Sequence, residues 1–240
     1  MSARAPRLRA TSAPSNTRGS VMRIGIIGAG MIGGTLGALL ARAGHDVALS
    51  NSRGADSLRE AVDRIGNGVR AMSVDEAATW GDVVVLAVPW RKPEALPPAE
   101  LVAGKIVVDA MNPYREGGGL HDLGTSSSSE ETAKRLPGAR VVKAFNTIYH
   151  KHLEANGTPD LPVDDRHAVF VAGDDDEAKR VVSELIEQIG FAPVDTGSLR
   201  DGGRRQQPGT SIYNMPMRGR EARDIIEHML AAARSNASRS

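Results

Sequence analysis

The sequence predicts an α/β fold built on a doubly wound, mostly parallel sheet. Short apolar runs rich in β-branched residues alternate along the chain with segments of helical pattern. The run Asp82–Val88 is apolar at nearly every position, as expected for a central parallel strand that is buried on both faces. A glycine-rich turn, Gly28-Ala-Gly-Met-Ile-Gly33, directly follows the first apolar run and opens a helix-like stretch.

The individual elements follow from hydrophobic periodicity. Apolar runs bounded by glycine, proline or polar residues predict strands over 23–27, 46–50, 69–72, 82–88, 105–109, 140–145, 168–172 and 191–195. Helical spacing predicts helices from the glycine-rich turn to Ala43 and over 54–65, 74–79, 174–189 and 219–233. Ser73 and Glu76 form the pattern of a capping box at the start of the third helix. Residues 117–129 and 202–209 predict loops, and we expect the first to be mobile.

Composition excludes several classes of function. Hydrophobic residues make up 40% and charged residues 25%, the profile of an ordinary globular protein. The absence of cysteine rules out disulfides, thiolate zinc sites and cysteine nucleophiles. A net charge of +1 and an aromatic content of 3% argue against a nucleic-acid surface, and no apolar run is long enough to cross a membrane. We therefore expect a cytoplasmic protein without nucleic-acid or membrane partners.

The glycine-rich turn predicts a dinucleotide site in a Rossmann-type fold. Gly28 permits the turn, Gly30 lets the backbone approach a pyrophosphate, and Gly33 allows the helix to pack closely on the strand. Backbone N–H groups at the start of the helix can donate to the phosphates. A motif of this kind can also be a simple tight turn, but here it lies between a strand and a helix of a βαβ unit. The predicted cofactor-binding residues of the motif are Gly28, Ala29, Gly30, Met31, Ile32 and Gly33.

The residues after the second strand indicate NADP(H) rather than NAD(H). NAD-specific sites usually place an acid about 20 residues after the motif. Here the stretch reads Ser50-Asn51-Ser52-Arg53, and the first acid is Asp56. Arg53 can pair with a 2′-phosphate, and Asn51 and Ser52 can donate hydrogen bonds to it. The alternative is that Arg53 is a solvated loop arginine.

These signals divide the chain into three parts. Residues 1–21 contain several arginines and no acid, lack the apolar core of a secretory signal, and predict a disordered N-terminal tail. Residues 22–150 form the NADP-binding Rossmann domain. Residues 151–240 form a smaller C-terminal α/β portion, in which a further βαβ unit and a terminal helix extend the sheet and contribute to a second-substrate site.

Several segments between Met22 and Leu199 resemble the NADPH-dependent reductases of the deazaflavin coenzyme F420. They are Gly28–Gly33 with Ser52-Arg53, Ala87–Trp90, Val141–Ile148, Ala172–Lys179 and Pro193–Leu199. The last two are the most distinctive, because Rossmann geometry alone does not require them. Lys143–Thr147 also resembles the cytoplasmic NADPH–flavin reductase domain of membrane metalloreductases. The resemblance therefore specifies NADPH more closely than it specifies the electron acceptor.

The resemblance implies further cofactor-binding residues. Val88 and Pro89 would line the nicotinamide and the pyrophosphate. Asn146, Thr147 and Ile148 would border the junction where the nicotinamide and the deazaflavin stack.

The region expected to hold the second substrate departs from archaeal-type members of the family. The departures are at Lys143–Asn146, in the 202–209 loop and in an insertion-like segment over Tyr149–Arg166. Four basic residues either meet the polyanionic tail of the deazaflavin or are solvated surface charges: Lys143, Arg204, Arg205 and Arg218.

Other candidate site residues have two interpretations each. Trp90 is either a wall of the nicotinamide pocket or an aromatic residue that caps the sheet. Asn112, with Tyr114, follows the fifth strand at the edge where ligands bind, and serves either the pocket or a turn. His150 and His152 are expected in a solvated loop and Asp174–Asp176 at a helix N-terminus, so no metal site is predicted.

The sequence thus predicts an NADP-dependent oxidoreductase that transfers a hydride between NADP(H) and coenzyme F420 as its small-molecule redox partner. Hydride transfer between stacked rings depends on positioning, so no catalytic acid or base is expected. The alternatives are an NADPH-dependent reductase of a flavin or of a small carbonyl or imine metabolite, and a non-catalytic NADP(H)-binding protein. A homodimer could form through the last helix, or the same apolar residues could pack on the chain's own sheet: Ile225, Ile226, Met229 and Leu230.

Overall fold

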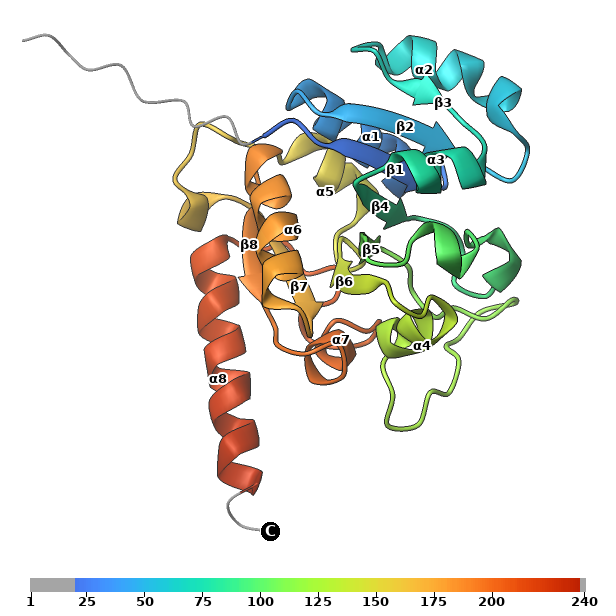
Figure 1. The fold of residues 1–240 in the computed structure, drawn as a ribbon. Helices are drawn as coiled ribbons and strands as arrows, with labels where there is room; N and C mark the ends of the chain where they lie inside the picture. The colour runs from blue at the N-terminus through green and yellow to red at the C-terminus, as the bar shows by residue number, and fades with distance from the viewer. Residues whose placement is uncertain (1–19, 238–240) are drawn as a thin grey trace, which may run out of the picture.

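The strands form one eight-stranded sheet with helices on both faces (Figure 1). The computed structural model describes residues 20–237, so the predicted tail over 1–21 lies outside the described residues except for its last two positions. The strand order is β3-β2-β1-β4-β5-β6-β7-β8, and neighbouring strands pair in parallel except β6 and β7. The strands are β1 (Arg23–Ile27), β2 (Asp46–Ser50), β3 (Arg70–Ala71), β4 (Val83–Leu86), β5 (Ile106–Asp109), β6 (Arg140–Ala144), β7 (Ala168–Gly173) and β8 (Ala192–Asp195). The predicted mostly parallel, doubly wound α/β fold is confirmed.

Helices connect most of these strands. They are α1 (Met31–Arg42), α2 (Arg59–Ile65), α3 (Val74–Trp80), α4 (Ser128–Arg135), α5 (His150–Ala155), α6 (Asp176–Gln188), α7 (Asp201–Arg205) and α8 (Gly219–Ala237). The predicted helix over 54–65 is divided into a 3-10 turn, Ala55–Leu58, and α2. Among the described residues, none of the helices has the length and apolar content of a membrane span.

Consecutive residues of the central strands point into two different cores, as a sheet covered on both faces requires. On β1, Ile24 and Ile26 join Leu36 of α1 in one core. Ile27 of the same strand joins Ala77 of α3 in the other core. All five side chains are fully buried, so β1 is fixed from both sides and its carboxyl end is held rigidly.

The last helix lies along the far end of the sheet, next to β7 and β8 (Figure 1). Its Ile226 belongs to a separate apolar cluster with Phe170, and Met229 and Leu230 pack against that cluster. Ile225 faces outward and is 37% exposed. For three of the four apolar residues considered in this helix, the structure therefore shows packing on the chain's own sheet.

The C-terminal βαβ unit is present as β7, α6 and β8, with β7 and β8 parallel. Asp175 is the N-cap of α6, and its side chain accepts a hydrogen bond from the Ala178 N–H. It also pairs with Arg140 on β6, and these contacts hold the pKa of Asp175 well below its usual range, the Arg140 hydrogen bond being the largest cause. The acidic cluster at this helix start is thus engaged in capping and in an ion pair.

Three short α-helices, α4, α5 and α7, were not predicted, and each begins in or occupies a segment that was predicted as a loop. Residues 117–129 end in Ser127–Ser129, which are fully buried at the start of α4. Ser127 and Glu130 form a complete capping box, the same pattern that predicted α3 at Ser73. The predicted 202–209 loop contains most of α7, and His150 and His152 lie on α5 rather than in a solvated loop.

Candidate functional site

Two cavities lie at the edge of the sheet where β1, β2, β4, β5 and β6 end. The first, of about 300 Å³, we call the glycine cavity. It lies where the strand order reverses between β1 and β4, the position at which open α/β sheets bind ligands. Its lining residues are Ile27, Gly28, Ala29, Gly30, Asn51, Ser52, Arg53, Val74, Ala87, Val88, Pro89, Lys92 and Ala95.

The backbone geometry at Gly28 and Gly33 agrees with the turn and the close packing that the sequence predicts. Gly28 has a φ of 109°, and a Cβ there would lie 2.4 Å from the Ala87 carbonyl oxygen. A Cβ on Gly33 would lie 1.8 Å from the Gly28 carbonyl oxygen, so α1 can approach the turn only with glycine at this position. A Cβ on Gly30 would meet nothing within 4 Å. Gly30 therefore leaves open the space through which a diphosphate would reach the backbone.

The first turn of α1 is suited to an anion. Gly30 is the N-cap and provides no side-chain hydrogen bond, and the first turn contains no acidic residue. No side-chain cap therefore occupies the N–H groups of that turn, so they can donate to a ligand, and the helix dipole favours negative charge there. A dinucleotide diphosphate fits this cradle in charge and in hydrogen-bonding capacity.

The far end of the glycine cavity is positively charged. Arg53 and Lys92 both line it, and neither side chain has an ion pair or hydrogen bond within residues 20–237. No acidic residue lines the cavity. Asn51 lines the cavity and its amide also holds the loop: it accepts from the Arg53 N–H at 2.8 Å and donates to Ser57 Oγ at 2.9 Å. Lys92 is a binding candidate that the sequence interpretation missed.

The second cavity, of about 290 Å³, adjoins the other side of the first turn of α1, and we call it the tyrosine cavity. It is formed at the carboxyl ends of β5 and β6, by the start of α5 and by residues 213 and 214. Its lining residues are Met31, Ile32, Ala110, Asn112, Tyr114, Phe145, Asn146, Ile148, Tyr149, His150, Tyr213 and Asn214. No Lys, Arg, Asp or Glu is among them, so the cavity suits an uncharged ring.

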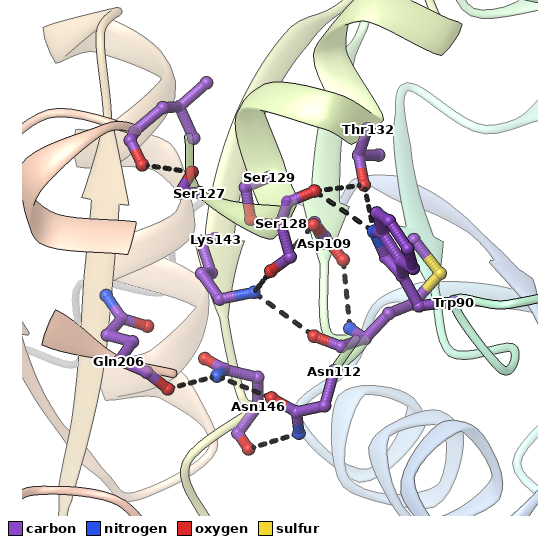
Figure 2. Close-up of polar contacts among 12 residues, drawn as sticks. Trp90, Asp109, Asn112, Ser127, Ser128, Ser129, Thr132, Lys143, Asn146 and Gln206 are labelled. Carbon is purple, nitrogen blue, oxygen red and sulfur yellow. Dashed lines mark hydrogen bonds and ion pairs between the residues drawn. The ribbon is translucent and has the colours of Figure 1, made fainter. Parts of the chain in front are cut away.

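Backbone and amide contacts shape this cavity. Phe145 turns the chain at the end of β6 with a φ of 64°, a conformation that costs a bulky residue energy and occurs mainly where structure enforces it. Asn112 Nδ2 donates to the Asn146 carbonyl at 2.9 Å, and Asn146 Nδ2 donates to Asn112 Oδ1 at 3.1 Å and to the Gln206 carbonyl at 2.7 Å (Figure 2). This network ties the ends of β5 and β6 to the segment after α7.

The predicted site residues divide between the two cavities, with three exceptions. Gly33 packs under the turn, and Thr147 is buried with its carbonyl accepting from the Asn214 N–H. Trp90 is 6% exposed, donates through Nε1 to the Ser128 carbonyl, and lies under the Arg135 guanidinium at 4.2 Å. Trp90 therefore packs in the core against α4, the second of its two interpretations, and lines neither cavity.

Both interpretations of Lys143 are wrong. Its side chain is fully buried, so it is neither a solvated surface charge nor within reach of a polyanionic tail. Its Nζ donates to the Met111 carbonyl at 3.1 Å and to Ser128 Oγ at 3.2 Å (Figure 2). Asp109, also fully buried, lies 3.9 Å away and accepts from Ser129 Oγ. Burial lowers the pKa of Lys143, and Asp109 opposes that shift. The prediction failed because α4 and β7 cover this end of β6.

The other three basic residues lie outside both cavities. Arg204 donates to the Thr125 carbonyl, and Arg205 donates to the Thr196 carbonyl at 2.9 Å. Arg218 lies 3.8 Å from Asp165 and lines a separate cavity beside His167. None of them is placed to meet a ligand in the tyrosine cavity.

The tyrosine cavity contains a pair of hydrogen-bonded phenols. Tyr114 Oη and Tyr213 Oη are 2.8 Å apart, and Asn112 Nδ2 lies 3.3 Å from Tyr213 Oη. Burial, and then the hydrogen bond with Tyr114, raise the pKa of Tyr213, so this phenol stays protonated. The pattern of the sequence gave no sign of Tyr213, which lies 101 positions from Asn112.

Comparison with known proteins shows what the chain is similar to. A family model described as NADP oxidoreductase, coenzyme F420-dependent, matches residues 23–113. The F420-dependent NADP reductase of Methanocaldococcus jannaschii is 34% identical over 134 residues, which cover 52% of this chain and 57% of that protein. The metalloreductase STEAP3 of Rattus norvegicus is 32% identical over 178 residues, or 74% of this chain and 34% of that protein.

Among solved structures, a hypothetical protein from Sinorhizobium meliloti is similar over nearly its whole length. It is 36% identical, with a TM-score of 0.72, and the match covers 83% of this chain and 96% of the other. In contrast, the chain spans about a third of the length of the metalloreductases that it matches. The similarity to those larger proteins therefore concerns one portion of them.

Proposed function

We propose that this chain, a member of the family of coenzyme F420-dependent NADP oxidoreductases, transfers a hydride between NADP(H) and coenzyme F420. NADP(H) would occupy the glycine cavity, and the ring of its redox partner would lie over the tyrosine cavity. The proposal rests on one observation: the two cavities meet at the first turn of α1. Ala29 and Gly30 line the first cavity, and the next two residues, Met31 and Ile32, line the second.

The lining of each cavity supports this assignment. Arg53 and Lys92 match the charge of a 2′-phosphate, and the absence of an acid removes the group that would recognise an unphosphorylated ribose. The tyrosine cavity contains no Lys, Arg, Asp or Glu and presents aromatic rings from Tyr114, Tyr149 and Tyr213, which suits a flat heterocycle. Asn146 lines it, and its buried Oδ1 has no hydrogen-bond partner among the described residues.

The residues of the chain would act by binding and orientation. When bound, NADPH would supply a hydride from its nicotinamide to the ring of the acceptor. The glycine turn and α1 fix the diphosphate, and the Asn112–Asn146 network fixes the cavity wall against which the rings would stack. Apolar residues such as Ile32 and Ile148 exclude water from the space between the rings. Proximity of this kind can supply most of the rate of a two-ring transfer.

A flavin is the second candidate acceptor. The metalloreductase match covers a larger share of this chain than the match to the F420-dependent reductase does. A flavin has the same flat shape, so the tyrosine cavity would accept either ring.

One assay separates these functions. The purified protein is mixed with NADPH and either oxidised coenzyme F420 or FMN, and the absorbance of NADPH and of the acceptor is followed together. Coupled loss of NADPH and F420 absorbance is the expected result. Turnover with FMN alone would establish the second candidate, and turnover only with an imine or a small carbonyl compound would reject both. Tight NADPH binding without turnover on any acceptor would indicate a nucleotide sensor.

A further inference from the structure

The tyrosines of this protein gather at one site. The chain contains 3 tyrosines, and all of them line the tyrosine cavity: Tyr114, Tyr149 and Tyr213. Two of these rings are unusually open to solvent, since Tyr114 is 40% and Tyr149 is 43% exposed. Met31, which is 68% exposed, lines the same cavity. Such a concentration of exposed aromatic surface in a chain with 3% aromatic residues indicates a surface that a flat ligand covers.

The hydroxyl groups of this cavity form a hydrogen-bonded network. The Asn112 amide is oriented by the Asn146 carbonyl, to which only its Nδ2 can donate. The same Nδ2 also donates to Tyr213 Oη. Tyr213 Oη and Tyr114 Oη share a hydrogen bond of 2.8 Å in which either hydroxyl can be the donor. That bond uses one of the two phenol protons, and the other has no acceptor among the described residues, so the pair offers one donor to whatever occupies the cavity.

Such a donor matches the charge change of the proposed reaction. When a hydride leaves the C4 of the nicotinamide, NADPH becomes NADP⁺ and a new C–H or N–H bond forms on the accepting ring. That ring, neutral before the step, gains one negative charge unless it also takes up a proton. In flavins and deazaflavins this charge is shared between a ring nitrogen and the neighbouring carbonyl oxygen. Hydrogen bonds to such an anion are stronger than those to the neutral ring.

We propose that the Tyr114–Tyr213 pair, oriented by Asn112, is the hydrogen-bond donor that stabilises the reduced, anionic ring of the acceptor. This inference rests on the proposed function, since it requires a ring acceptor in the tyrosine cavity. The protonated state of Tyr213, which burial maintains, keeps the donor available across the neutral pH range. No Lys or Arg lines the cavity, and its one basic side chain is that of His150.

The test compares binding of the two oxidation states of the acceptor. Dissociation constants are measured for the wild type, Tyr114→Phe and Tyr213→Phe with F420, or with FMN if only FMN supports turnover. The oxidised form is titrated in the presence of NADP⁺ and the reduced form in the presence of NADPH, so that neither mixture can transfer a hydride. Both variants should lose about ten- to hundredfold in affinity for the reduced form and less than about threefold for the oxidised form. Tyr114 is exposed, so its variant is expected to fold normally whatever becomes of Tyr213.

Thr79→Val is the control. It removes a hydroxyl from the exposed face of α3, outside the tyrosine cavity. We expect its ratio of the two dissociation constants to equal that of the wild type. Equal losses for both oxidation states in Tyr114→Phe, no loss at all, or the same change of ratio in Thr79→Val would overturn the assignment. Failure of the wild type to reduce either acceptor would instead reject the proposed function itself.

Discussion

At the scale of single residues, we expect the two unpaired cations of the glycine cavity, Arg53 and Lys92, to decide which nucleotide binds. Arg53→Gln and Lys92→Gln each remove a charge that faces no acid within the cavity. A charge-assisted hydrogen bond contributes about 1.5–3 kcal/mol, so each variant should bind NADPH about ten- to hundredfold more weakly while its NADH affinity stays the same. Fluorescence titration with both nucleotides measures the effect.

Arg59→Gln is the control for this pair of variants. Arg59 is an exposed arginine on α2 that pairs with Asp56 and lies outside the glycine cavity. Its NADPH affinity should match that of the wild type. An equal weakening of NADPH and NADH binding in Arg53→Gln would show that Arg53 does not recognise the 2′-phosphate.

Alanine substitutions at two glycines of the motif should have different effects, one on NADPH binding and the other on stability. Gly30→Ala places a methyl group in open space, so the variant should keep its Tm but bind NADPH about ten- to hundredfold more weakly, because the methyl group lies in the path of the diphosphate. Gly33→Ala places the same group against the Gly28 carbonyl oxygen and should cost at least about 1–3 kcal/mol. That corresponds to a Tm lower by roughly 2–4 °C per kcal/mol. A thermal scan and a titration on each variant suffice, and a lower Tm for Gly30→Ala would contradict the idea of an open cradle.

At the scale of elements, two capping boxes allow a matched comparison. Ser73 caps α3 on the surface, while Ser127 caps α4 and also donates to the Leu199 carbonyl at 2.6 Å in a buried position. Ser73→Ala should cost about 1 kcal/mol, the usual value of a cap. Ser127→Ala should cost about 2–4 kcal/mol, because it also leaves a buried carbonyl unsatisfied. Urea unfolding gives both values, and equal costs would mean that the Leu199 contact contributes nothing.

The elements also show which parts of the fold a sequence can predict. Strands such as β1 and β4 are buried on both faces, so their apolar runs predict them directly. Helix α4 is polar, with Ser, Glu, Lys and Arg at most positions, and only its capping box at Ser127 and Glu130 gave a signal. The antiparallel direction of β7 against β6 has no local signature, because it depends on how the 145–167 connection returns.

The candidate site also has one part that the sequence predicts and one part that it does not. The glycine cavity is lined largely by residues 27–53 and 87–89, which lie close to the glycine-rich motif in the sequence or in the sheet. The sequence therefore predicted most of its lining residues. The tyrosine cavity depends on contacts between residues far apart in the chain. Tyr213 and Asn112 meet only after the C-terminal segment folds back, and the burial of Lys143 depends on α4 and β7. No pattern within a window of sequence reveals such contacts.

At the scale of the whole molecule, the sheet continues across the boundary between the predicted parts 22–150 and 151–240. β6 belongs to the first part and β7 to the second, and they pair directly. The Asn146–Gln206 and Asn112–Tyr213 hydrogen bonds cross the same boundary. We therefore expect the two parts to unfold as one cooperative unit, although the sequence suggested separate portions.

The two tryptophans provide a way to test this cooperativity. Trp80 and Trp90 are the 2 tryptophans of the chain, and both lie in the first part. Ile226 lies in the second part, in the cluster under α8, where it is 3% exposed. Ile226→Ala should cost about 2–5 kcal/mol through lost burial and the cavity left behind. In a cooperative molecule, this loss of stability should lower the unfolding midpoint reported by tryptophan fluorescence, and that midpoint should coincide with the one from circular dichroism.

The adjacent Ile225→Ala is the control, because Ile225 is 37% exposed and its truncation should change the unfolding midpoint little. If Ile226→Ala left the tryptophan transition in place while a second transition appeared by circular dichroism, the two parts would be independent domains, and the tyrosine cavity would lie at a mobile junction rather than in a rigid wall.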